Sequence, residues 1–87
     1  MEATVYGRVQ GVNFRNFTRL AARRLGLSGE VGNLPDSTVR VRAEGEETGL
    51  RALVKQLQQG PPGSRVEKVT TRWSEFRGDY TDFSIAD

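Results

Sequence analysis

The sequence contains neither cysteine nor histidine among its 87 residues. Without cysteine there is no disulfide framework and no thiolate nucleophile, and without both residue types a zinc site of the usual nitrogen or sulfur ligands is excluded. Mechanisms that use phosphocysteine, phosphohistidine or a serine–histidine pair are excluded as well. Any chemistry must therefore use Arg, Lys, Asp, Glu, Asn, Ser, Thr, Tyr or backbone groups.

Long apolar runs and a secretory signal segment are also absent, so we expect a cytoplasmic protein that does not bind membranes. The 13 basic and 11 acidic residues are interspersed and leave a net charge of +2. A nucleic-acid binder usually concentrates its basic residues on one face, and we expect no nucleic-acid partner here. The one basic cluster, Arg19, Arg23 and Arg24, is interpreted as a solvated helix face.

Apolar spacing predicts the secondary structure. Alternating or apolar segments at residues 3–9, 27–34, 38–44, 65–75 and 83–85 are typical of strands, and the break in alternation between Val66 and Val69 predicts a bulge. Helical spacing predicts helices over about 14–25, ended by Gly26, and 46–59, ended by Gly60 and two prolines.

This order is βαββαβ with a short C-terminal fifth strand. Right-handed crossovers place both helices on one face of a mainly antiparallel sheet, which is the ferredoxin-like α+β sandwich. No linker, repeat or low-complexity segment interrupts the chain, so residues 1–87 are predicted to form a single domain with one core.

The segment Gly7–Arg15, between the first strand and the first helix, has the composition of an anion site. Backbone amides of such a loop converge, the helix N-terminus adds further donors, and glycine allows a ligand to approach closely. Arg15 falls in the first helical turn, where a guanidinium can make two hydrogen bonds to a phosphate. From spacing alone, a tight turn at Gly11 with a solvated Arg15 explains the pattern equally well.

Residues Gly7–Arg15, which read G-R-V-Q-G-V-N-F-R, closely resemble the signature of the acylphosphatase family. A second segment, Gly29–Asp36, resembles another motif of that family, and Glu44-Gly45 and Gly60–Val66 are similar to it too. The resemblance covers the whole chain. It implies an enzyme that hydrolyses the carboxyl–phosphate anhydride of small acyl phosphates, with no metal, no cofactor and a monomeric chain.

The resemblance also assigns the site residues. The family binds the phosphoryl group with the arginine of the first motif and with loop amides, which here are Arg15 and the amides of Val9, Gln10, Gly11 and Val12. The asparagine of the second motif, here Asn33, orients the attacking water. Without the resemblance, the preferred interpretation of Asn33 is an asparagine that ends a strand or lies in a turn.

These site residues are suited to the hydrolysis of an acyl phosphate. A carboxylate leaves easily because its conjugate acid has a pKa of about 4, so no general acid is needed. Phosphoryl transfer otherwise depends on positioning and on stabilisation of charge. An alkoxide is a far poorer leaving group, and phosphate monoesters should therefore react poorly.

Four positions depart from the usual family pattern. Glu30 stands where an aromatic residue is common, Gly32 replaces a basic or polar residue, Ser37 occupies a position often held by glycine, and Asn13 replaces a smaller residue. Glu30 and Asn33 have opposite parity along a strand, so Glu30 should not point at the phosphate.

Two other function classes remain open. An RNA-binding module on this fold needs exposed aromatic residues on its sheet. Tyr6 of the first strand is one, but the outward residues of the third strand are not aromatic: Thr38, Arg40, Arg42 and Glu44. The second alternative is a catalytically weak acylphosphatase-like domain with a binding or regulatory role.

Overall fold

The computed structural model describes residues 1–75 and 77–86. Within them the chain forms β1 (Glu2–Arg8), α1 (Phe14–Arg24), β2 (Ser28–Asn33), β3 (Val39–Glu44), α2 (Glu47–Gln59), β4 (Arg65–Arg72) and β5 (Phe83–Ile85). This is the predicted order of elements, and the boundaries of all but β4 agree closely with the sequence patterns.

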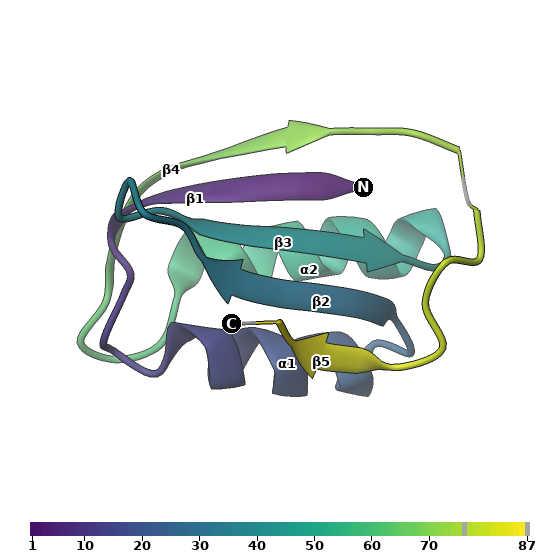
Figure 1. Cartoon of the computed structure of the whole chain (residues 1–87), viewed down its shortest axis with the longest axis horizontal. Coiled ribbons are helices and arrows are strands. Elements are labelled where there is room, and N and C mark those ends of the chain that lie inside the picture. Colours follow the sequence, from purple (N-terminus) through teal and green to yellow (C-terminus); the bar gives the residue numbers. More distant parts are fainter. Residues whose placement is uncertain (76, 87) are drawn as a thin grey trace.

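The strands form one sheet in the order β4-β1-β3-β2-β5. The β1–β3, β1–β4 and β2–β3 pairs are antiparallel, and only β2–β5 is parallel. Both helices cover the same face of the sheet, with α1 against β2 and β5 and α2 against β4 and β1 (Figure 1). The ferredoxin-like α+β prediction is confirmed.

The core lies between the sheet and the two helices. Each helix contributes the residues of one face, which are Phe14, Thr18, Ala21 and Ala22 from α1 and Leu50, Leu53 and Leu57 from α2. The inward residues of the strands, among them Val5, Val31, Val39 and Val41, are completely buried. Neither α1 nor α2, the helices of the described part of the chain, has the length and apolar character that a membrane crossing requires.

A β-bulge interrupts the pairing of β4 with β1, as the broken alternation predicts. Tyr6 is paired with Lys68 but Gly7 is paired with Val66, so Glu67 is an extra residue in β4. Because of this extra residue, Val66 and Val69 both pack against the core. Gly7 has a φ of +126°, and a Cβ there would lie 2.1 Å from the Arg65 carbonyl oxygen, so glycine is required at this position.

The prediction that the fourth strand extends to residue 75 is wrong, because β4 ends at Arg72. Arg72 is paired with Glu2, the first residue of β1, and β4 has no other neighbour in the sheet. Trp73 therefore lies beyond the strand, 41% exposed, with the Arg51 guanidinium 4.9 Å from its ring centroid. The alternation of apolar residues continues past this point, but the partner strand does not.

The arginines of α1 are only partly solvated. Arg24 is exposed, as expected, whereas Arg23 donates to the Phe83 carbonyl and forms a 3.0 Å ion pair with Asp82. Arg19 donates to the Asn16 side chain, and its Nε is buried. Gly26 has the left-handed φ of +73° expected after a helix C-terminus.

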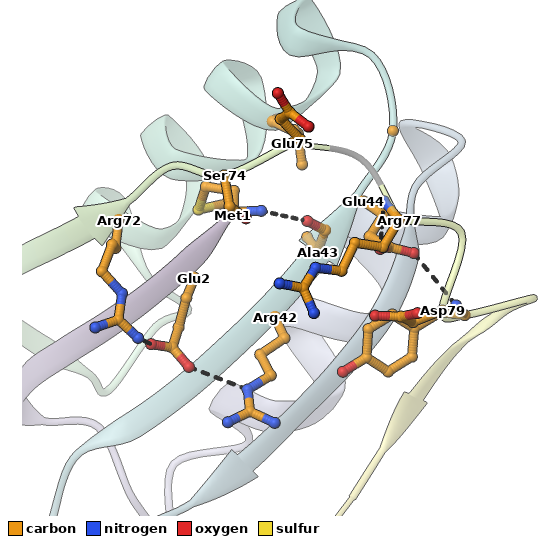
Figure 2. Close-up of a pocket in the computed structure, with 13 residues that line it drawn as sticks. Met1, Glu2, Arg42, Ala43, Glu44, Arg72, Ser74, Glu75, Arg77 and Asp79 are labelled. Atoms are coloured by element: carbon orange, nitrogen blue, oxygen red, sulfur yellow. Dashed lines mark hydrogen bonds and ion pairs between the residues drawn. The ribbon is translucent and has the colours of Figure 1, made fainter.

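Charged side chains organise the end of the sheet where the chain begins. Glu2 accepts from Arg42 at 3.0 Å and from Arg72 at 2.9 Å, which links β1, β3 and β4 (Figure 2). The nearly buried Glu44 carboxylate accepts from the backbone amides of Arg77 and Tyr80. Glu44 thus binds the segment that leads from β4 to β5.

The Glu2 pair predicts a stability that depends on pH. The hydrogen bond from Arg42, assisted by the charge of Arg72, holds the pKa of Glu2 below its ordinary value of 4.5. The folded chain then binds this proton less readily than the unfolded chain, so the stabilisation is present above pH 4.5 and is lost as the pH falls through the lowered pKa. Glu2→Gln should lower the free energy of unfolding at neutral pH and have a smaller effect at about pH 3.

Urea unfolding at the two pH values measures this difference. Glu67, which is exposed and has no ion pair within the described chain, provides the matched control. Glu67→Gln should change the stability by less than about 0.5 kcal/mol at neutral pH. An equal loss for Glu2→Gln at both pH values would show that the ion pairs contribute nothing.

Candidate active site

In the loop of residues 9–13, residues with positive φ values alternate with residues that have negative φ values. Gly11 has a φ of +74° and Asn13 a φ of +66°. Gln10, which precedes Gly11, and Val12, which lies between the two, do not have positive φ values. Such alternation turns successive N–H groups toward one side and makes a concave site for an anion, called a nest. The conformation at Asn13 also explains why a smaller residue is usual there, since few residues other than glycine and asparagine adopt it readily.

Two valines anchor this loop while its amides stay open. Val9 is buried and Val12 packs against the core, whereas Gly11 and Asn13 are exposed. Among residues 1–75 and 77–86, no acceptor receives a hydrogen bond from the amides of Gln10–Asn13. Those donors are therefore available to a ligand or to solvent.

The start of α1 adds donors at the same place. Its N-cap residue, Asn13, makes no capping hydrogen bond through its side chain, and the first turn contains no acidic residue. The positive end of the helix dipole is thus not balanced by the helix itself, which favours an anion there. Arg15 is the second residue of α1 and is half-buried.

Asn33 ends β2 on the face that carries the helices. Gly29 and Val31, four and two residues earlier, are buried on that face. The Oδ1 atom of Asn33 is buried and has no hydrogen-bond partner in the described chain. Buried side-chain oxygens normally have a partner, so this atom is a candidate to accept a hydrogen bond from a bound molecule.

Glu30 lies on the opposite, open face of the sheet, as its parity predicts. Its carboxylate is 3.8 Å from the Arg42 guanidinium. Gly32 lies on the same face, opposite Arg40 of β3. Neither departure from the family pattern is therefore on the face that carries Asn33.

The side chain of Gln10 connects the loop to the end of β2. Its Nε2 donates to the Leu34 carbonyl at 2.8 Å and to the Thr38 carbonyl at 2.9 Å. Leu34 directly follows Asn33, so the loop lies beside the strand end that carries the asparagine. The sequence interpretation assigned only the backbone amide of Gln10 and missed this contact, for which the sequence carries no signal.

The turn between β2 and β3 is itself well ordered by hydrogen bonds. The Asp36 carboxylate accepts from the amide and the hydroxyl of Thr38, and these bonds hold the pKa of Asp36 below its ordinary value. Ser37 has a φ of +78°, which explains why glycine is usual there. Serine in this conformation costs about 1 kcal/mol relative to glycine.

Two hollows in the surface lie outside this loop. One of about 380 Å³ is lined by Met1, Glu2, Arg42 and Glu44, at the opposite end of the sheet (Figure 2). Two of its arginines, Arg42 and Arg72, are already paired with Glu2. The other, of about 290 Å³, is lined by Gly32, Asn33, Arg40 and Arg42 among others.

Metal ligands are not grouped in the described chain. Residues 1–75 and 77–86 contain no group of three or more His, Cys, Asp or Glu side chains that could hold a metal ion.

Comparison with known proteins gives consistent results. A family model described as Acylphosphatase matches residues 1–85. An acylphosphatase of Dehalococcoides mccartyi is 48% identical over 86 residues, which cover 98% of this chain and 94% of that protein. The crystal structure of acylphosphatase from Bacillus subtilis has a TM-score of 0.95 at 36% identity and covers 99% of this chain and 96% of that chain.

A similar unit also occurs inside a larger protein. Full-length HypF, whose crystal structure is described as the phosphate- and nucleotide-bound form, has a TM-score of 0.85 at 30% identity. The match covers 99% of this chain but only 11% of HypF.

Proposed function

The chain belongs to the acylphosphatase family of hydrolases, and we propose that it hydrolyses acyl phosphates with Arg15, Asn33 and the loop amides of Val9, Gln10, Gly11 and Val12, without a metal or cofactor. The substrate is a small molecule with a carboxyl–phosphate anhydride. The products are a carboxylate and inorganic phosphate.

One observation carries this proposal: the Gln10 side chain bonds to both sides of the hairpin turn that follows Asn33. The open amides of the loop and the unpartnered Oδ1 of Asn33 therefore occupy neighbouring positions. A phosphoryl group in the loop and a water molecule at Asn33 would then be adjacent, which is the requirement for attack.

In the proposed reaction the water oxygen forms a bond to phosphorus while the bond from phosphorus to the acyl oxygen breaks. The leaving carboxylate keeps the electron pair of that bond, and the proton of the water passes to solvent or to a phosphate oxygen. Arg15 and the loop amides bind the phosphoryl oxygens and stabilise the charge that spreads over them. Asn33 Oδ1 accepts a hydrogen bond from the water and fixes its direction of attack.

A catalytically weak domain with a binding or regulatory role is the alternative. The match to 11% of full-length HypF favours it, because there a unit of this kind is one part of a much longer chain. The full-length match to acylphosphatases of similar size favours the enzyme. The single domain, the monomeric state and the cytoplasmic location stay predictions.

The first test is hydrolysis of benzoyl phosphate, a small aromatic acyl phosphate, at neutral pH. We expect turnover that is unchanged by a chelator and far slower turnover of phosphate monoesters, because the site supplies no acid for an alkoxide. Inorganic phosphate should inhibit competitively as a product that binds the same loop. Loss of activity in chelator, restored by a divalent ion, would contradict the proposed mechanism.

Replacement of Arg15 tests the contact to the phosphoryl group. Arg15→Ala should weaken phosphate inhibition and lower kcat by on the order of a hundredfold or more. Arg15→Lys should recover little, because a single ammonium cannot reproduce two parallel hydrogen bonds. Near-normal kinetics of the lysine variant would show that the assigned contact is wrong. Arg24→Lys, a change in an exposed arginine of the same helix, is the matched control.

Replacement of Asn33 should separate catalysis from binding. Asn33→Ala removes the contact to the water but none to the phosphate, so kcat should fall by on the order of a hundredfold or more, with the phosphate inhibition constant within a few-fold of the parent. Near-UV circular dichroism at Trp73 checks the fold. If phosphate affinity falls together with kcat, Asn33 belongs to the anion site instead.

A further inference from the structure

The Gln10 side chain is the polar link between the two halves of the candidate site. Both of its hydrogen bonds come from Nε2, so each hydrogen of the amide group has its own carbonyl acceptor. Gln10 is only partly exposed, and both bonds span more than twenty residues of sequence. In the described chain, no other hydrogen bond joins residues 9–13 to residues 33–38.

This link is needed because the two halves come from strands that are not neighbours. The sheet order places β3 between β1, which leads into the loop, and β2, which ends at Asn33. Val39 of β3 is paired with both Val5 and Asn33. The loop therefore begins beyond the level of Asn33 and must pass the start of β3 to reach α1 (Figure 1).

The acceptors of Gln10 are held in place independently. The Leu34 amide donates to the Thr38 carbonyl at 2.9 Å, and the Ser37 amide donates to the Leu34 carbonyl at 3.2 Å. The two carbonyls that receive the Gln10 bonds thus belong to one closed turn. Gln10 therefore attaches the loop to a turn that is closed by its own backbone hydrogen bonds, rather than to a single side chain.

We propose that Gln10 is a positioning residue, which sets the distance and angle between a phosphoryl group in the loop and the water held by Asn33. This inference rests on the proposed function. The curvature of the loop comes from the backbone of Gly11 and Asn13, so the loop can bind phosphate without the link. The link acts on the placement of the two reactants, and small misplacements cost catalysis far more than binding.

The decisive variants keep the size of Gln10 and change its hydrogen bonding. Gln10→Met removes both donors, and Gln10→Glu sets a carboxylate against two carbonyl oxygens. For each we expect kcat on benzoyl phosphate to fall about ten- to a hundredfold, with the inhibition constant for inorganic phosphate within about twofold of the parent. Parental kcat in both variants would overturn the inference, and so would an equal loss of phosphate affinity.

Asp36→Ala is the matched control. It removes two hydrogen bonds from the same turn but none from the loop. Its kcat should remain within about twofold of the parent at a temperature at which both are folded. A fall as large as that of Gln10→Met would show that any loosening of the turn has this effect, which contradicts a specific role for Gln10.

A double-variant cycle tests whether Gln10 acts through Asn33. In an Asn33→Ala background no water is held in place, so adding Gln10→Met should lower kcat by less than about twofold further. Losses that multiply in full would show that Gln10 acts independently of Asn33 and would overturn the inference.

A readout without turnover separates this inference from the proposed function. In the parent, titration with inorganic phosphate should shift the NMR signals of the loop amides and of the Asn33 side-chain amide. In Gln10→Met the loop signals should still shift, but the Asn33 response should fall by more than about half, because the two sites are no longer held together. An unchanged Asn33 response overturns the inference, whereas a folded parent that hydrolyses no acyl phosphate overturns the proposed function.

Discussion

The unpaired backbone amides between β1 and α1 are the constraint on which the candidate site depends. Gly11 and Asn13 adopt left-handed conformations there. Within the described chain, the amides of Gln10–Asn13 donate no hydrogen bond to any acceptor. The helix that follows has neither a side-chain cap nor an acidic residue in its first turn. An arginine near a helix N-terminus is unfavourable by a few tenths of a kcal/mol to about 1 kcal/mol. A bound phosphate would accept hydrogen bonds from the loop amides and would also balance the positive charge at the helix N-terminus.

The fold separates this site from the charges that stabilise the sheet. The loop and Asn33 lie where β1 and β2 end, whereas Glu2, Arg42 and Glu44 organise the opposite end of the sheet (Figure 2). Glu2 is paired with two arginines of the open face, and Glu44 binds the segment that leads to β5. Arg42 and Arg72 are thus engaged in ion pairs at this end of the sheet.

Three of the four departures from the usual family pattern have local structural explanations. Glu30 joins the ion pairs of the open face through Arg42. Ser37 and Asn13 keep the left-handed backbone that glycine adopts more easily, at a small cost in stability. These residues therefore affect the stability of the chain more than the chemistry proposed for it.

The sequence by itself determined the element order, the ferredoxin-like fold, the bulge near Val66 and the conformation of Gly26, because each depends on local periodicity or on the backbone freedom of single residues. It did not determine where β4 ends, because Arg72 is the last residue with a partner in β1. Nor did it indicate the paired state of Arg23 or the contact of Gln10 with Leu34 and Thr38. These contacts join residues far apart in the chain. The packing of α1 against β5 brings Arg23 to Asp82, and the packing of β1, β3 and β2 in one sheet brings Gln10 to its acceptors.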